Sequence, residues 1–218
     1  MEKIRNIVFD LGGVLFNIDY QTTVDAFIRL GVKDFDKFFT QEAQIHLFDK
    51  FERGEVPPEY FREELRQLLG LRISDEQIDH AWNAMLLDFP LHHLVLLDGV
   101  RNNYRIFLLS NTNEIHYPVY QAYMMQTIGY RGLDHYFEQS YLSFKMRMRK
   151  PELRIFQHVL SENGLVAEET LFIDDTYQHV EGARKAGINA LWLDLKVMNV
   201  TDLFNWRFQL RQEVKELC

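Results

Sequence analysis

Four short stretches of the chain carry residues that could act together on a phosphate ester. They contain Asp10, Ser110, Lys150 and the pair Asp174 and Asp175. A carboxylate such as Asp10 can attack phosphorus and carry the phosphoryl group, which divides one difficult displacement into two easier ones. A lysine would offset the negative charge of the carboxylate and the phosphoryl oxygens, and a serine hydroxyl would hold another oxygen. The set predicts phosphoryl transfer.

A carboxylate nucleophile repels a phosphate dianion, so a hard cation must lie between them. Mg²⁺ takes oxygen ligands, typically one or two carboxylates together with waters and substrate phosphate. Asp10 and Asp175 would supply these carboxylates, with Asp174 as a further ligand or in the outer coordination sphere. The sequence therefore predicts Mg²⁺ as the cofactor.

The elements that must position these residues are apolar runs rich in β-branched, aromatic and leucine residues, which predict strands buried on both faces. The runs span residues 4–9, 105–109, 140–143, 171–173 and 190–193. Helical patterns over 151–163 and 178–186 separate the later runs, and each stops at a glycine. Strand–helix–strand repetition predicts right-handed crossovers and a parallel sheet. An α+β fold fits less well, because the alternation is regular from Tyr104 onward.

Each reactive residue also has an ordinary explanation when it is taken alone. Asp10 or Asp174 could cap a helix, and Ser110 could start a turn. Lys150 could be a solvated surface charge. However, ligands of an open parallel sheet bind beyond the carboxyl ends of the strands, and all four stretches fall at that edge. The convergence favours a common site.

Between about residues 17 and 89 the strand signals vanish and helical patterns follow one another. Segment 57–70 places apolar residues on one face, and Ser74 with Gln77 forms a capping box before the next helix. The sequence thus predicts a helical cap over 17–89, inserted after the first strand of a discontinuous core formed by 1–16 and 90–218. The tail 201–217 alternates charges along a helical pattern and predicts an exposed terminal helix.

The amino-acid composition limits the kinds of molecule that the protein is expected to bind. The 218 residues are 47% hydrophobic and 26% charged, enough to bury a core. A formal charge of −8 and a pI near 5.5 argue against nucleic acid or an anionic membrane as the main partner. The single cysteine, Cys218, rules out an intramolecular disulfide framework and indicates a reducing compartment. We expect a cytoplasmic protein that binds a small phosphorylated metabolite, and the oligomeric state is left open.

The four stretches resemble the ordered motifs of the haloacid dehalogenase-like hydrolase superfamily. They read FDLGGV from Phe9, LSN from Leu109, RKP from Arg149 and IDD from Ile173. The resemblance spans most of the chain and implies a three-layer Rossmann-like α/β core with a cap after the first strand. The stretches DLGGVLFNID, FERGEV, LLSNTN and MRKPELRIFQHVL are most similar to the bacterial branch that includes α-D-glucose-1-phosphate phosphatases.

This resemblance implies a role for each matching position. Asp10 is implied as the nucleophile, Lys150 as the phosphate-stabilising lysine, and Ser110 and Asn111 as phosphate contacts. Mg²⁺ would be held by Asp10, Asp175 and the backbone carbonyl of Gly12. The cap loop adds two candidates for contact with the leaving group, which are Arg53 and Glu55.

The sequence departs from the family pattern at Gly12. Most phosphatases of the superfamily carry a second aspartate there, which protonates the leaving oxygen. General acid–base help of that kind is typically worth ~10²–10⁴ in rate. Its absence matters least for leaving groups that are stable anions, so sugar 1-phosphates, acyl phosphates and aryl phosphates fit better than alkyl esters. Asp19 could replace the acid, although capping of a helix is the more common role for such a residue.

Alternative functions follow from the same position. A haloacid dehalogenase needs no acid to release halide, although those enzymes usually carry a larger residue at position 12. A catalytically degenerate member would bind a ligand without turning it over, against which stands the retention of Asp10, Lys150 and Asp175. A receiver domain would carry its paired acids at the first strand, and a dinucleotide-binding domain would need a third glycine after Gly13. Neither pattern is present.

Overall fold

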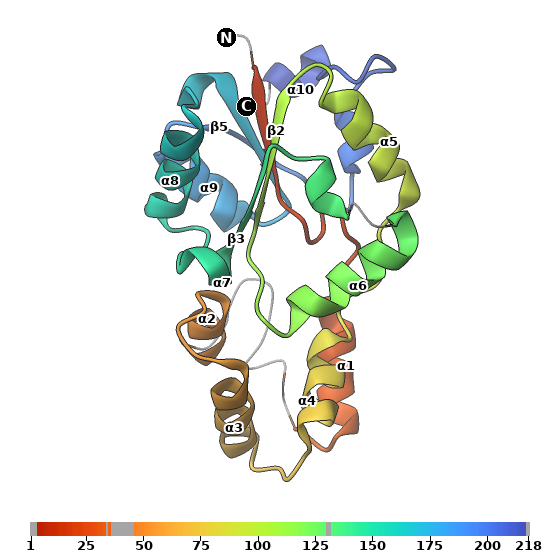
Figure 1. The fold of residues 1–218 in the computed structure, drawn as a ribbon, viewed down its shortest axis with the longest axis vertical. Coiled ribbons are helices and arrows are strands. Elements are labelled where there is room, and N and C mark those ends of the chain that lie inside the picture. The colour runs from red at the N-terminus through yellow and green to blue at the C-terminus, as the bar shows by residue number, and fades with distance from the viewer. Residues whose placement is uncertain (1–3, 34, 36–45, 130–131, 217–218) are drawn as a thin grey trace.

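A computed structural model describes residues 4–33, 35, 46–129 and 132–216. Its centre is a five-stranded parallel sheet with the order β3-β2-β1-β4-β5 (Figure 1). The strands are β1 (Asn6–Phe9), β2 (Arg105–Ser110), β3 (Gln139–Leu142), β4 (Thr170–Asp174) and β5 (Asn189–Trp192). Each predicted strand is present within two residues of its expected bounds, because the apolar runs are buried on both faces.

Helices cover both faces of this sheet (Figure 1). They are α5 (Leu91–Val100) and α6 (His116–Ile128) on one face, and α8 (Leu153–Asn163) and α9 (Tyr177–Lys185) on the other. Side chains of a strand alternate between the faces, so Ile7 and Phe9 pack toward α5 and α6 while Val8 packs toward α8 and α9. The predicted three-layer α/β fold is confirmed.

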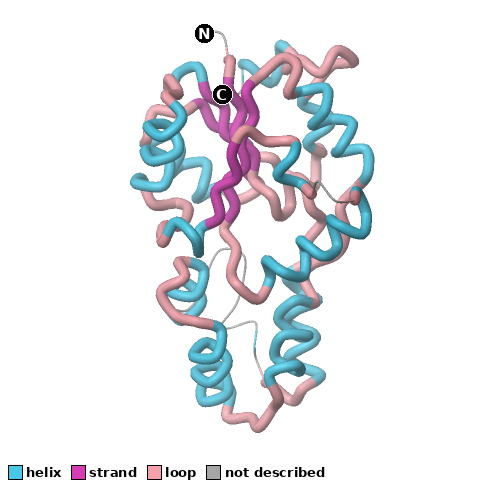
Figure 2. The backbone as a smooth tube through the Cα atoms, in the orientation of Figure 1, coloured by secondary structure: helices cyan, strands magenta, loops and turns pink. Residues whose placement is uncertain are grey.

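A helical insert lies between β1 and α5, beyond the carboxyl ends of the strands (Figures 1 and 2). It comprises α1 (Tyr20–Arg29), α2 (His46–Glu52), α3 (Pro58–Leu69) and α4 (Asp75–Asn83). The insert has an aromatic cluster of its own, in which Phe51 stacks on Phe61 at 4.1 Å between ring centroids and Phe48 stacks on Trp82 at 5.1 Å. Burial of these rings joins α2, α3 and α4, and Phe27 of α1 is buried in the same cluster.

The ends of the insert helices follow the local sequence. Ser74 and Gln77 make the predicted capping box at the start of α4. Gly70 ends α3 in the left-handed conformation, with φ 62°. Asp19 accepts a hydrogen bond of 2.9 Å from the backbone N–H of Gln21 and caps α1, as the more common interpretation of that residue predicts.

Two expected helices differ from the structure. Helix α8 begins at Leu153, two residues after the expected start at Pro151, because a turn closed by the bond from Glu152 N–H to Arg149 O precedes it. The expected exposed terminal helix is wrong. Short elements bend this tail back over the sheet, and Leu203, Phe204 and Leu210 are buried in the core on the α5 side. The apolar residues of the tail thus outweighed its charge pattern.

Short helical elements complete the described chain. They are α7 (Ser143–Met146), η2 (Leu133–His135), η3 (Ala167–Glu169), η4 (Val200–Leu203) and α10 (Gln212–Glu216). Within the described residues, no helix combines the length and apolar character needed to cross a bilayer.

Candidate active site

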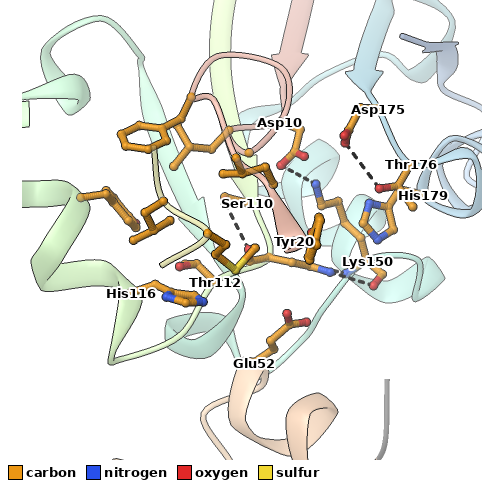
Figure 3. A pocket seen from close by; sticks show the side chains of 18 of the residues that line it. Asp10, Tyr20, Glu52, Ser110, Thr112, His116, Lys150, Asp175, Thr176 and His179 are labelled. Atoms are coloured by element: carbon orange, nitrogen blue, oxygen red, sulfur yellow. Dashed lines mark hydrogen bonds and ion pairs between the residues drawn. The ribbon is translucent and has the colours of Figure 1, made fainter. Parts of the chain in front are cut away.

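A buried lysine joins two carboxylates at the end of the central strands. Lys150 Nζ lies 2.7 Å from Asp10 Oδ1 and 2.6 Å from Asp174 Oδ2, and the side chains of Lys150 and Asp174 have no solvent exposure. Figure 3 shows the contact between Asp10 and Lys150 at the wall of a cavity. Charges are buried at this depth only when they are paired. Three residues that the sequence analysis placed at one sheet edge are therefore in direct contact.

The sheet register explains this convergence. Strands β1 and β4 are parallel neighbours in which Phe9 pairs with Ile173, so the next residues, Asp10 and Asp174, emerge at the same level. Lys150 reaches them from the turn before α8, where Asn111 holds its main chain. The Asn111 side chain accepts a bond of 2.9 Å from Lys150 N–H and donates one of 3.0 Å to Lys150 O. The Asn111 amide thus fixes the main chain of the lysine, and Asn111, which is expected to contact phosphate, also lines the cavity.

Asp174 is an anchor for the charged lysine. Its carboxylate also contacts His179 Nδ1 at 3.0 Å and accepts a bond of 2.8 Å from the backbone N–H of Thr176. Burial alone would raise the pKa of Asp174, but His179 and Lys150 outweigh it and hold that pKa well below its usual range. Burial would lower the pKa of Lys150, but Asp10 and Asp174 raise it. Both groups are therefore ionised.

The pKa of Asp10 responds differently to the same environment. Burial raises it to about 6, even though the positive charge of Lys150 works in the opposite direction. A cation beside this carboxylate would lower the pKa again and favour the ionised, nucleophilic form. Such a nucleophile is best activated when a second positive charge joins Lys150.

The donor set fits that cation. Asp10, Asp174 and Asp175 each offer a carboxylate oxygen, and these oxygens lie within 4.8 Å of one another. All are hard oxygen donors of the kind that Mg²⁺ prefers. Asp10 and Asp175 line the cavity, whereas Asp174 is fully buried behind it, so Asp10 and Asp175 are the carboxylates best placed for direct coordination.

Two glycines follow Asp10 in the turn after β1, and the structure gives a different reason for the missing side chain at each position. Gly13 has φ +79°, and a Cβ there would stand 2.2 Å from Asp175 Oδ2, so only glycine allows the Asp175 carboxylate to pack over this turn. Gly12 lies outside the left-handed region, and a Cβ there would meet Ile18 Cδ1 at 2.9 Å. The backbone carbonyl of Gly12 accepts no hydrogen bond from the described residues, which keeps its oxygen available for a cation.

Ser110 ends β2 as predicted and is buried at the cavity wall, where Thr112 lies next to it (Figure 3). The expected cap-loop residues lie elsewhere. Arg53 forms an ion pair of 2.6 Å with Glu152, Glu55 is exposed, and neither lines the cavity. Glu52, one residue before Arg53, does line it.

The remaining lining of the cavity comes mainly from the helical insert. We call this surface the leaving-group wall, and it consists of Ile18, Tyr20, Glu52, Trp82, Met85 and His116. Burial and the nearby carboxylates, Asp175 foremost, raise the pKa of Tyr20 well above its usual range, so its phenol keeps the proton. The cavity has a volume of about 80 Å³.

Several of these residues escaped the sequence analysis. His179 stands in the first turn of the helix after Asp174, and His116 stands six residues after Ser110. The one local signal that could have pointed to either histidine is its position close to a predicted motif. Trp82 packs in the aromatic cluster of the insert and also lines the cavity.

Comparison with known proteins places this geometry among characterised relatives. The family model "haloacid dehalogenase-like hydrolase" matches residues 4–187. The D-ribitol-5-phosphate phosphatase of Bacteroides thetaiotaomicron is 32% identical over 184 residues, which cover 84% of this chain and 89% of that protein.

Solved structures agree with the sequence comparison. The HAD family enzyme BT-2542 of Bacteroides thetaiotaomicron, in complex with magnesium and inorganic phosphate, superposes with a TM-score of 0.81 at 36% identity, covering 93% of this chain and 100% of that one. A HAD-like family hydrolase from Porphyromonas gingivalis gives 0.76 at 34% identity, covering 88% and 91%. An L-2-haloacid dehalogenase from Xanthobacter autotrophicus, 22% identical with a TM-score of 0.59 over 87% and 77%, shares the fold.

Proposed function

Because this chain belongs to the haloacid dehalogenase-like hydrolase family, we propose that it hydrolyses a small phosphorylated metabolite through an aspartyl-phosphate on Asp10. The observation that carries the proposal is the Asp10 carboxylate, which faces a cavity at the strand ends and lies 2.7 Å from the buried ammonium of Lys150. A carboxylate that merely supported the fold would have no reason to line a cavity beside two further acids.

Some of the predictions are confirmed by the comparisons. The family predicted from four motifs, the hydrolase class with phosphatase relatives, and Mg²⁺ as cofactor are all supported at high coverage of the chain. The branch that includes α-D-glucose-1-phosphate phosphatases is not singled out. The nature of the phosphate ester therefore belongs to the proposal.

The proposed reaction uses the residues in a fixed order. An Asp10 oxygen attacks phosphorus while the bond from phosphorus to the leaving oxygen breaks, and water then releases phosphate from Asp10. Lys150 offsets negative charge in both steps, and Ser110 holds a phosphoryl oxygen. Asp10, Asp175 and the Gly12 carbonyl would hold Mg²⁺, which shields the nucleophile from the charge of the phosphate when it is bound.

We place the substrate between the core, 1–16 with 90–218, and a cap formed by 17–89. Three ion pairs hold α2 and the residue that follows it against the core. Arg149 lies 2.6 Å from Asp49 and 2.8 Å from Glu52, and Arg53 pairs with Glu152. A closed cap would exclude water and strengthen the electrostatic effects on the phosphate.

Two ester types are supported by different observations. Gly12 provides no acid, which favours a leaving group that is stable as an anion, and a sugar 1-phosphate has one. The ribitol-5-phosphate specificity in the relative's name favours a polyol phosphate instead. Dehalogenation has the weaker support, since the dehalogenase resemblance is limited to the fold.

The test compares turnover with covalent labelling. We expect Mg²⁺-dependent phosphate release from p-nitrophenyl phosphate, glucose 1-phosphate or ribitol 5-phosphate, and an acid-stable ³²P label on the wild type that Asp10→Asn loses. Asp134→Asn, an exposed aspartate outside the cavity, serves as the matched control. Faster turnover of glucose 6-phosphate than of glucose 1-phosphate would contradict the leaving-group reasoning. Absence of both label and turnover in the wild type would indicate a binding protein.

A further inference from the structure

We propose that His116 selects a leaving group that carries uncharged hydroxyl groups, by presenting a hydrogen-bond acceptor from the leaving-group wall. The proposal rests on the proposed phosphatase function and names a specificity determinant within the same cavity. Its evidence is the position of the imidazole, the hydrogen bond that fixes its tautomer, and the chemistry of the rest of the wall.

His116 is a core residue held rigidly at the cavity. It opens α6, and its backbone N–H donates a bond of 2.9 Å to Asn113 Oδ1, which also accepts one of 3.0 Å from Ile115 N–H. The residue is 7% exposed and lines the same cavity as Asp10 (Figure 3). Its ring therefore faces bound substrate while being shielded from bulk water.

One hydrogen bond determines which ring nitrogen carries the proton. Nδ1 of His116 lies 2.8 Å from Oδ1 of Asn83, and an amide oxygen can only accept. Nδ1 is therefore the donor, and in a neutral imidazole Nε2 then has a free lone pair. Burial lowers the pKa of His116 to about 3, so the ring is neutral at physiological pH. Among the described residues, Nε2 has no hydrogen-bond partner of its own.

The helical insert fixes the plane of the ring. The imidazole stacks on Trp82 with centroids 5.4 Å apart and an angle of 2° between the planes. Trp82 and Asn83 are successive residues at the end of α4, so one helix sets both the orientation and the tautomer of His116. This arrangement prepares an acceptor before any substrate binds.

The rest of the leaving-group wall indicates what that acceptor meets. Glu52 Oε2 is engaged by Arg149, whereas Oε1 accepts no hydrogen bond in the described part of the chain. The cations that line the cavity, Arg149 and Lys150, are both paired with carboxylates. The wall therefore offers two acceptors and the protonated Tyr20 phenol, which can donate or accept, but no uncompensated cation. This combination favours a neutral hydroxyl group over a carboxylate or phosphate. Polyols and sugars fit this description.

The experiment compares esters with and without hydroxyl groups on the leaving group. For the wild type, we expect kcat/KM for ribitol 5-phosphate or glucose 1-phosphate to exceed that for n-pentyl phosphate. His116→Phe keeps the stacking on Trp82 and removes the acceptor, so it should reduce this preference about 10- to 100-fold. It should change kcat/KM for p-nitrophenyl phosphate less than about threefold, because that leaving group donates no hydrogen bond.

Two further variants complete the design. His116→Gln retains an amide oxygen that can accept, and should recover part of the preference. His80→Phe, an exposed histidine of α4, should leave it unchanged. If His116→Phe does not fold, the comparison of His116→Gln with the wild type decides the matter.

Two results would overturn the inference. One is an equal loss on p-nitrophenyl phosphate and on the hydroxylated esters, which would make His116 a structural residue. The other is a wild type that does not prefer either hydroxylated ester to n-pentyl phosphate. Failure of the wild type to hydrolyse any of the four esters is a different outcome, which contradicts the proposed function itself.

Discussion

The two sides of the cavity are built in different ways. On the carboxylate side, Asp10 and Asp174 lie at the ends of neighbouring strands, and Lys150 joins them from the turn before α8 to form one buried ionic cluster. The leaving-group wall is assembled from α1, α2, α4 and α6, and its key contacts are an aromatic stack and a neutral hydrogen bond. One side is set by a sheet register, and the other by how helices of the insert pack.

Because of this difference, we expect the carboxylate side to determine the reaction and the leaving-group wall to determine which substrate is preferred. Every phosphate ester presents the same group to the carboxylate side, so a change there should affect all substrates alike. Esters differ only in what they present to the leaving-group wall, so a change there should depend on the substrate. The effects of substitutions on the two sides can therefore be told apart by comparing substrates.

The largest effect is expected from Gly13→Ala on the carboxylate side. The new methyl group would stand 2.2 Å from Asp175 Oδ2 and would require a left-handed backbone, so it must displace a carboxylate needed for Mg²⁺. Mutation of a residue that orients a metal ligand typically costs about 10- to 100-fold in metal affinity or in activity. We expect at least that loss of kcat/KM, equal for p-nitrophenyl phosphate and ribitol 5-phosphate, and partial recovery at high Mg²⁺.

Gly132→Ala provides a matched control, because Gly132 also has a positive φ but lies away from the cavity. Its activity should match that of the wild type. If Gly13→Ala lost activity on one ester only, this would contradict the expectation that changes on the carboxylate side affect all esters alike.

A smaller effect, and a gain, is expected from Gly12→Asp at the border between the two sides. The backbone at Gly12 accepts a side chain, and the new Cβ meets only the mobile end of Ile18, at 2.9 Å. A carboxylic acid there could protonate the leaving oxygen. Full acid catalysis is worth ~10²–10⁴, and because Ile18 must move aside we expect about a tenfold rise in kcat for n-pentyl phosphate, with little change for p-nitrophenyl phosphate.

The control for this gain is Gly12→Asn, which has the same size and no acidic proton. It should show no rise. An equal rise with both variants would mean that position 12 acts through packing, and a rise on p-nitrophenyl phosphate would contradict the leaving-group explanation.

The smallest effect concerns stability and tests how deeply the leaving-group wall is buried. The pKa of His116 is lowered to about 3 in the folded protein, against ~6.5 when unfolded. Between these values the unfolded chain binds a proton that the folded chain excludes. The free energy of unfolding therefore has its full value above pH 6.5 and declines as the pH falls. The slope is at most about 1.4 kcal/mol per pH unit from this residue.

Urea unfolding at pH 7, 6 and 5 measures that slope. His116→Gln has no titrating group at this position and should lose less stability than the wild type on acidification. His80→Gln, on the exposed face of α4, should run parallel to the wild type. Identical slopes for all three proteins would mean that water reaches the His116 ring.

The sequence alone placed the residues of the carboxylate side at one edge of the sheet. Parallel strands with buried, continuously apolar runs must end at a common edge, so Asp10, Ser110 and Asp174 could be placed together from their positions after those runs. The order of the four motifs then gave the family. Local rules also predicted the Ser74 capping box and the Asp19 cap, because these depend on residues only a few positions apart.

The leaving-group wall could not be predicted in the same way. Arg53 and Glu55 were expected there, yet Glu52 is the residue that faces the cavity. Glu52 is the last residue of α2, whereas Arg53 and Glu55 lie in the turn that follows, where no helical periodicity fixes the direction of a side chain. Likewise, no local pattern predicts that Trp82 stacks on His116, 34 positions along the chain.

The sequence by itself determined the family, the parallel sheet and the acids that meet at its edge, because strand ends and motif spacing leave few alternatives. Only the tertiary structure decided that Asp174 anchors Lys150, that Asp175 packs on Gly13, and that Asn83 fixes the tautomer of His116. These contacts join segments that are distant in the sequence. Their geometry depends on how whole helices pack, and a pattern of residue types does not record that packing.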